Sequence, residues 1–348
     1  MAIKFKKPEI NIREKLAELD KPSGVAGEAV LRAETSQEQF NLIGAGRRNL
    51  LINGDFQVSQ RGDYTSASTM PNAYVLDRWL CDRNGTATVQ HTSGHDIPGT
   101  PAICKAIKLV QTVTANNYLG IRQKIENPTQ YVGRTITYSA WVRSNTPNAR
   151  IQWYTQGTTQ TAIGPAHSGN GEWEYLSFTA TMSGNPSTAW WVDAFIDNGA
   201  YTNTTITAGE FIEVTMAQLE IGTAATPFEH RSYGEELALC QRYFTVIPNG
   251  IFGIASSSST FVYSYQLPVQ MRATPTVSLT STNQRQGDTV AQGISVTSAS
   301  VSNNGYTTST VAVFVITGTL SVAATPYRMY LYEATGSFPA KVHLSAEL

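Results

Sequence analysis

The sequence predicts a mostly β protein built around a β-sandwich, and three observations lead to this prediction. Only 15% of the 348 residues are charged, and the formal net charge is −1. Glycine, serine, threonine and asparagine are plentiful, which suits short strands joined by polar loops. Apolar and polar residues alternate with the period of a strand through most of the chain. We therefore expect a short helical N-terminal arm, a jelly-roll β-sandwich, a short helix and a β-rich C-terminal domain.

Residues 1–47 form the first predicted unit, because they are dense in charged residues and poor in aromatic ones. Asn11 can cap a short helix in which Ile12, Leu16 and Leu19 share one face. A helix of this length is marginal alone in water, so its apolar face needs a partner. We expect this segment to be an arm that anchors the protein to another one, with a solvated tail as the alternative.

Residues 48–232 form the second predicted unit, a sandwich of short antiparallel strands. All six tryptophans lie in it, at positions 79, 141, 153, 173, 190 and 191. Alternating segments cover residues 135–144, 149–156, 174–182, 188–197 and 210–221. Gly, Asn, Pro and Ser clusters separate them, which is typical of a jelly roll.

Residues 233–348 form the third predicted unit, in which a short helix over 234–244 precedes further strands. The segment 311–316 is apolar on both faces, so it is either central in a sheet or buried between subunits. We expect contacts with other copies of the chain through Val311, Val313, Phe314 and Val315.

Two groups of motifs carry a resemblance to a known family. RNLLINGDFQVSQRG (48–62) and DRW (77–79) look like the opening of the carbohydrate-binding-like jelly-roll domain of bacteriophage virion proteins. VTMAQLEIGTAATPFEHRSYGEELALCQRYF (214–244) resembles the end of that domain and the helix after it. YQLPVQMRATPTV (265–277) and the terminal LSAEL resemble the ends of tail fibres of marine and cyanobacterial phages.

The resemblance implies a virion fibre protein, usually a homotrimer, that carries a sugar-binding-like module. We then expect residues 1–47 to contact other virion proteins and the module to contact a host cell-surface polysaccharide. Such a protein is made in the host cytoplasm, released by lysis and found in the virion. One alternative is a decoration or spacer protein of capsid, neck or tail without receptor contact. A second alternative is a glycan-degrading tail enzyme.

Aromatic residues are the candidates for contact with sugars, because a pyranose ring has an apolar face that stacks on a flat ring. Neighbours in a strand point to opposite faces, so one of Trp190 and Trp191 should face outward. Trp79, in the DRW motif, and Trp141 are expected in the core. The glycan-binding candidates are Trp190, Trp191, Trp153, Tyr263, Tyr265 and Tyr306.

The sequence offers little that a catalyst needs, and we expect no enzyme and no catalytic residue. A glycosidase uses two facing carboxylates, and residues 245–348 contain only Asp288, Glu333 and Glu347 as acids. His91 and His95 lack the glutamate and the helix of a zinc-binding HExxH motif. GxSxG, Walker and dinucleotide-binding motifs are absent from the sequence.

We expect no cofactor, and the one metal ion that the sequence suggests is a structural calcium. Related jelly rolls often hold a structural calcium ion near the first and last strands, which would place Asp55 and Glu220 as ligands here. Calcium prefers several hard oxygens, and this set is poor in charge. The near-neutral charge argues against binding to nucleic acid. The sequence contains no run of about 18 apolar residues, so membrane insertion is not expected. Cys81, Cys104 and Cys240 are expected as reduced, buried thiols.

Overall fold

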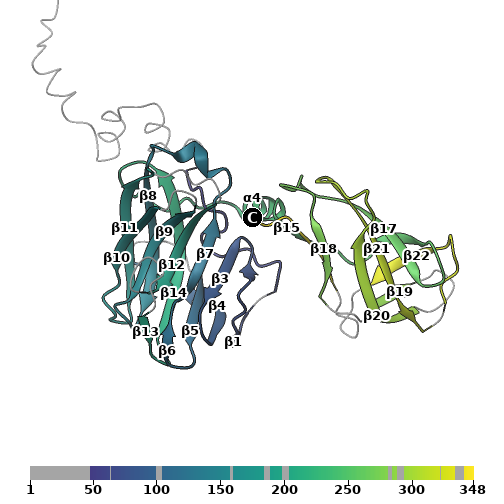
Figure 1. Ribbon diagram of the computed structural model, residues 1–348, viewed down its shortest axis with the longest axis horizontal. Helices are drawn as coiled ribbons and strands as arrows, with labels where there is room; N and C mark the ends of the chain where they lie inside the picture. The colour runs from purple at the N-terminus through teal and green to yellow at the C-terminus, as the bar shows by residue number, and fades with distance from the viewer. Residues whose placement is uncertain are drawn as a thin grey trace, which may run out of the picture.

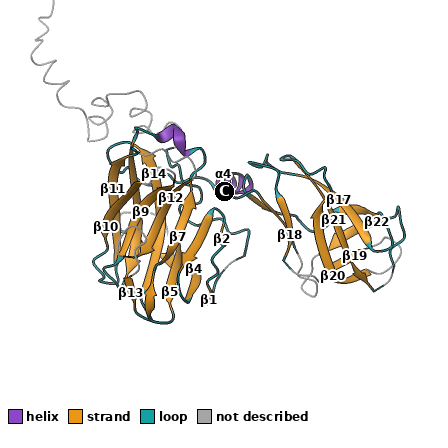
Figure 2. Ribbon diagram, in the orientation of Figure 1, coloured by secondary structure: helices purple, strands orange, loops and turns teal. Residues whose placement is uncertain are grey.

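The computed structural model describes residues 48–62, 64–98, 104–156, 160–183, 189–197, 204–280, 284–287, 294–321, 323–333 and 341–348. They form two β bodies with helix α4 (Tyr233–Gln241) between them (Figure 1). Strands dominate both bodies, which confirms the predicted mostly β class (Figure 2). The predicted arm, with Ile12, Leu16 and Leu19, lies outside the described residues.

The first body is a sandwich of two six-stranded antiparallel sheets, as predicted. Sheet A has the order β1 (Ser68–Thr69), β4 (Ala87–His95), β5 (Cys104–Gln111), β14 (Phe211–Ile221), β8 (Thr135–Ser144) and β11 (Trp173–Thr181). Sheet B has the order β10 (Gln160–Ala166), β9 (Ala149–Gln156), β12 (Ala189–Ile196), β7 (Leu119–Lys124), β3 (Trp79–Arg83) and β2 (Tyr74–Leu76). A small pair, β6 (Ala115–Asn117) with β13 (Thr204–Ile206), and the 3₁₀ turn η1 (Pro128–Tyr131) complete it.

The facing sides of sheets A and B bury one continuous apolar core. Alternation along each strand decides which residues enter it: Trp190, Val192 and Ala194 of β12 point inward, and Trp191 between them points outward. Trp153 and Trp190 meet edge to face in this core, with ring centroids 5.4 Å apart.

The motif segments 48–62, 77–79 and 214–244 are hydrogen-bonded to one another through Asn53. Asn53 donates from its side-chain amide to the carbonyls of Val58 and Asp77, and its own carbonyl accepts from the Trp79 indole. Its backbone N–H reaches the carboxylate of Glu236 on helix α4. These residues therefore serve the fold.

A second set of bonds ties the opening segment to the last strand of the sandwich. The Asn49 side chain donates to the carbonyl of Ala217 at 3.0 Å and accepts from the N–H of Leu219 at 3.0 Å. Gly54 lies so close that a Cβ built on it would be 2.2 Å from the Ala217 carbonyl oxygen. Only glycine fits this approach.

Helix α4 and a three-stranded sheet connect the two bodies. Ser232 and Glu235 form a capping box that fixes the start of the helix. The sheet has the order β15 (Phe244–Val246), β23 (Val342–Ser345) and β18 (Thr276–Leu279). Glu347, just beyond β23, pairs with Arg61 and Arg78 of the first body. Arg78 also stacks on the Tyr243 ring, 3.7 Å from its centroid.

The second body is a closed antiparallel barrel with its own core. Its strand order is β16 (Phe252–Ala255), β17 (Thr260–Gln266), β21 (Val311–Leu320), β20 (Ile294–Asn303), β19 (Gln284–Gly287) and β22 (Met329–Glu333). Phe314 fills the interior and stacks on Tyr263, with centroids 5.5 Å apart. The expectation that Phe314 contacts another copy is wrong, because alternation turns it inward with Ala312 and Ile316. Val311, Val313 and Val315 face outward and are partly exposed.

Two further expectations concern thiols and membranes. The three cysteines are free and buried, as predicted. Within the described residues, no helix has the length and apolar character that crossing a membrane would need.

Candidate functional site

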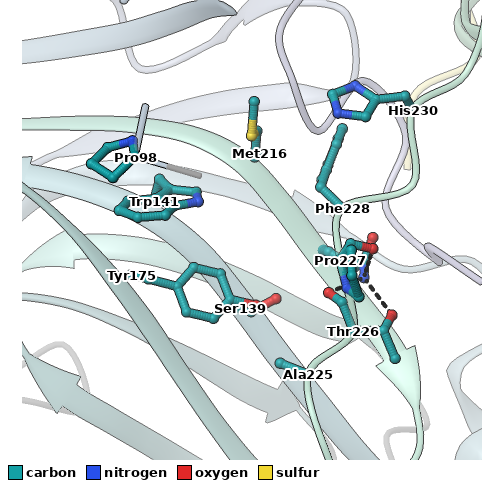
Figure 3. Close-up of a pocket in the computed structure, with 11 residues that line it drawn as sticks. Pro98, Ser139, Trp141, Tyr175, Met216, Ala225, Thr226, Pro227, Phe228 and His230 are labelled. Atoms are coloured by element: carbon teal, nitrogen blue, oxygen red, sulfur yellow. Dashed lines mark hydrogen bonds between the residues drawn. The ribbon is translucent and has the colours of Figure 1, made fainter. Parts of the chain in front are cut away.

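A cleft of about 500 Å³ opens on the outer face of sheet A. Strands β8, β11 and β14 form its floor, and the segment 225–230 that follows β14 forms its wall (Figure 3). The residues that line it are Pro98, Ser139, Trp141, Tyr175, Met216, Gln218, Ala225, Thr226, Pro227, Phe228 and His230.

Two aromatic rings dominate the floor of the cleft. Trp141 of β8 and Tyr175 of β11 are cross-strand partners, with ring centroids 5.4 Å apart and planes at 52°. Tyr175 is 44% exposed, and Trp141 is partly buried. Burial is the main cause that raises the pKa of Tyr175 above its usual value of 10.0, so its hydroxyl stays protonated at neutral pH. The pair offers apolar ring faces beside a hydroxyl donor.

The wall of the cleft is fixed by two buried side chains of β14. The Gln218 amide donates to Glu220 Oε1 at 3.0 Å and to the Thr226 carbonyl at 3.2 Å, and its oxygen accepts from the Glu229 N–H at 2.7 Å. Glu220 accepts from the N–H and the hydroxyl of Thr226 at 2.8 and 2.7 Å. The wall is therefore held in place before any ligand arrives.

A bulge in β14 brings a flexible apolar side chain into the cleft. The pairing of β14 with β8 shifts between Thr215 and Gln218, and Met216 has a φ of 49°. This left-handed conformation is uncommon outside glycine. The extra residue turns Met216 outward, where it packs in a cluster with Trp141 and Phe228.

A polar network continues the floor beyond the aromatic pair. Arg143 lies two residues after Trp141 on β8, and its guanidinium is 3.5 Å from the buried carboxylate of Glu213. That carboxylate also accepts from Thr92 Oγ1 at 2.6 Å and lies 3.1 Å from His95 Nε2. Trp173, the cross-strand partner of Arg143, packs its ring edge to face on His95. Aromatic and charged groups thus share one face of sheet A.

None of the six predicted glycan-contact residues lines the cleft. Trp190, Trp153 and Tyr263 are completely buried, so the expectation that they contact a glycan is wrong. Each occupies the inward phase of its strand and fills a core. The remaining candidates, Trp191, Tyr265 and Tyr306, are not brought together with the cleft.

These three residues have different surroundings. Trp191 lies on the outer face of sheet B, with the Arg122 guanidinium 5.1 Å from its ring centroid. Tyr265 packs partly against the barrel core, and Tyr306 is 73% exposed between β20 and β21.

The expectation that Trp141 lies in the core of the sandwich is wrong, because Trp141 lines the cleft on the outer face of sheet A. The signal that could have found it is alternation: Tyr138, Ala140 and Val142 of the same strand point into the core. Trp141 must then point outward.

The two predicted calcium ligands have separate roles. Asp55 Oδ2 accepts from the Gln57 side chain at 3.2 Å, whereas Glu220 is used by the wall of the cleft. In the described part of the chain, no group of three or more His, Cys, Asp or Glu residues is gathered to hold a metal ion. Calcium binding stays a prediction for which these two residues do not supply a ligand set.

Comparisons with known proteins give structural neighbours only. No protein-family model matches the chain, and no curated protein matches it. The enzymatically active domain of tailspike protein 4 of bacteriophage CBA120 is similar with a TM-score of 0.34 and 16% identity, over 50% of this chain and 21% of that one. The CBM22-1 xylan-binding domain of Paenibacillus barcinonensis Xyn10C gives 0.32 and 13%, over 52% of this chain and 100% of that domain. A putative sugar binding protein of Bacteroides thetaiotaomicron gives 0.29 and 12%, over 50% and 100%.

Proposed function

We propose that the cleft on sheet A binds a polysaccharide chain and that the protein is a bacteriophage virion fibre protein that recognises a host cell-surface polysaccharide in this way. The observation that carries the proposal is the pair Trp141 and Tyr175, which present neighbouring ring faces in an open cleft.

The chemistry of the cleft matches that of a sugar. A pyranose ring stacks its apolar face on an aromatic ring and directs its hydroxyls to the edges. The side chains of Tyr175, Thr226 and His230 line the same cleft as the two rings, and the Arg143 guanidinium lies further along the same face of sheet A. Because Gln218 and Glu220 already hold the wall, a ligand does not have to order it on binding.

We further propose that the protein binds the polysaccharide without cleaving it. Hydrolysis of a glycosidic bond needs two carboxyl groups free to face the sugar. Three carboxylates beside the cleft are already engaged: Glu220 by Thr226, Glu213 by Thr92 and Arg143, and Glu229 by Asn49 and Arg231. We propose that these carboxylates hold the site in shape and do not react with the sugar.

The virion role rests on the sequence motifs and completes the proposal. The protein works as a homotrimer in the particle, and residues 1–47 anchor it to other virion proteins. A shallow sugar site binds with a Kd of about 1 µM to 1 mM. Several linked copies can raise the apparent affinity by about 10² to 10⁴ without any new contact.

The test is binding of the full chain to a glycan array and to purified bacterial surface polysaccharides. Tyr175→Ala should weaken binding to the best glycan about tenfold or more, since one stacking ring is lost. Tyr175→Phe should keep most of it, because the ring remains. Tyr233→Ala is the matched control, as Tyr233 is 56% exposed on helix α4 and does not line the cleft. Equal binding by Tyr175→Ala and the control would contradict the proposal.

Two measurements separate the alternatives. New reducing ends after incubation with the bound polysaccharide would show an enzyme. If the chain binds no glycan and an electron-microscopy map of the particle places it away from the receptor-facing end, it is a spacer or decoration protein.

A further inference from the structure

One wall of the barrel carries a continuous apolar surface on its outside. The strand register aligns Met329 of β22 with Ile254 of β16, Ile254 with Val262 of β17, and Val262 with Val315 of β21. These residues form an unbroken row across four neighbouring strands. Their neighbours along each strand, such as Gly253, Tyr263 and Phe314, are buried, so the row itself faces outward.

A second row broadens this surface. Phe252 is the cross-strand partner of Leu331, and Val313 lies two residues before Val315. The residues Phe252, Ile254, Val262, Val313, Val315, Met329 and Leu331 are called the barrel face below. Phe252 is 55% exposed, Ile254 50% and Met329 56%. None of these seven residues is charged, and Ser264, Ser302 and Thr317 border them.

The barrel face is large enough to form the apolar centre of a protein interface. Its exposed apolar area is on the order of 500 Å², a size at which the largest apolar patch of a soluble protein is often functional. A stable interface buries about 800 Å² on each partner, with an apolar centre and a polar rim. The seven residues supply such a centre, and the bordering Ser and Thr side chains supply such a rim.

We propose that the barrel face packs against other copies of this chain. A surface without charge needs a partner that is also apolar and uncharged, and the same face on a neighbouring copy meets this need. The other exposed large apolar residues of the described chain are Val113, Val132, Ile163 and Tyr175 on the first body, Tyr233 on helix α4, and Tyr306 and Tyr327 on the second body. Burying seven apolar side chains in one contact would stabilise the assembly through the hydrophobic effect.

A segment of the same chain is the competing occupant. Residues 1–47 join the described chain at Arg48, whose guanidinium donates to Thr226 Oγ1 and the Pro227 carbonyl. This junction lies at the cleft of the first body, whereas the barrel lies beyond helix α4 (Figure 1). A segment of 47 residues is long enough to reach the barrel, but 15 of its residues are charged, so the uncharged face of a second copy is the better match.

The inference is independent of the glycan proposal, and it gives the proposed self-association a surface. It retains Val313 and Val315 from the sequence prediction and replaces Phe314 by Phe252, Ile254 and Met329. The cleft and the barrel face lie on different bodies, so one can fail while the other stands.

The first test is the mass of the full chain in solution, measured by light scattering. The wild type should show a multiple of the chain mass. Ile254→Asp with Met329→Asp should show the mass of a single chain, because an aspartate buried in the contact has no partner. Val113→Asp with Ile163→Asp is the matched control, since Val113 and Ile163 are 57% and 47% exposed on the first body. A single-chain mass for the wild type, or an unchanged mass for the first pair of variants, would overturn the proposal.

The second test identifies the occupant by thiol labelling. The native cysteines are buried, so a maleimide should react mainly at a cysteine introduced by Met329→Cys. Protection from the maleimide in an oligomeric protein supports the proposal. Protection in a monomeric protein indicates that residues 1–47 cover the barrel face, which contradicts it, and free reaction in an oligomer contradicts it as well. Tyr175→Ala should leave both mass and protection unchanged.

Discussion

Gly54 is a single residue on which the closure of the sandwich depends. A Cβ at this position would stand 2.2 Å from the backbone oxygen of Ala217, which is held by Asn49 and cannot move freely. Gly54→Ala should therefore destabilise the protein by about 2–3 kcal/mol, as overpacking of a tight contact does. Gly234→Ala is the control, because nothing lies within 4 Å of a Cβ there and the site is helical. Urea unfolding of both variants checks this, and equal midpoints would argue against a tight closure.

His343 gives the fold a pH dependence at the residue scale. Burial beside Phe244, together with Arg61 and Lys341, lowers the pKa of His343 from 6.5 to about 4. Between these values the unfolded chain binds the proton more readily than the folded one, so stability falls as pH drops from about 6.5 to about 4. Burial raises the pKa of Asp77 to about 6, so its contribution has the opposite sign over much of the same window.

The measurement is consequently a difference between two proteins. The free energy of unfolding of the wild type minus that of His343→Gln should decrease as pH falls from about 6.5 to about 4. Asp77 is common to both proteins and cancels. A difference that stays constant over this range would show that His343 has an ordinary pKa.

At the scale of an element, β12 shows how alternation divides two adjacent tryptophans. Trp190 is buried between the sheets, and Trp191 lies outside beside Arg122 and Lys124. Trp190→Ala should lower the free energy of unfolding by about 3–5 kcal/mol, because the substitution leaves a cavity in the core. Trp191→Ala should lower the free energy of unfolding by about 1 kcal/mol, which is the strength of an exposed cation–π contact. Similar melting temperatures for the two variants would contradict the placement of the strand.

The same alternation explains how much could be predicted from the sequence. The alternation of apolar and polar residues over 135–144 and 188–197 identifies strands, and several such segments predict the sandwich. Alternation does not show which face of a strand points into the core. The sequence therefore could not tell whether Trp190 or Trp191 is buried, and the pairing with neighbouring strands decides it. Phe314 was misplaced for the same reason, because a strand apolar on both faces can close a barrel as well as join two subunits.

The cleft was beyond reach of the sequence because distant segments build it. Its rings come from β8 and β11, its wall from the residues after β14, and Met216 enters through a bulge that no local pattern announces. The family-like motif 214–244 contains seven of the eleven residues that line the cleft, from Met216 to His230. The two rings of the floor, Trp141 and Tyr175, lie outside the motifs, so the resemblance gave no signal for them.

At the scale of the whole molecule, Glu347 couples the two bodies. Its carboxylate pairs with Arg61 and with Arg78, whose side chain is 2% exposed. Glu347→Gln should weaken the contact between the two bodies by about 3–5 kcal/mol, since it leaves the buried guanidinium of Arg78 without its counter-charge. Calorimetry should then resolve separate transitions for the sandwich and the barrel. Glu172→Gln, an exposed change on the sandwich, should leave the trace unaltered. If both variants unfold like the wild type, the junction does not depend on this contact.

The proposal that the cleft on sheet A is the sugar site is tested most directly by calorimetric titration of the best glycan from the array into three proteins. The wild type is compared with Trp141→Ala and Trp191→Ala, since both tryptophans are partly exposed but lie on opposite outer faces of the sandwich. Trp141→Ala should raise the Kd about tenfold or more, equivalent to at least about 1.4 kcal/mol, while Trp191→Ala should leave it unchanged. An unchanged Kd for Trp141→Ala together with a raised Kd for Trp191→Ala would place the site on sheet B and contradict the account.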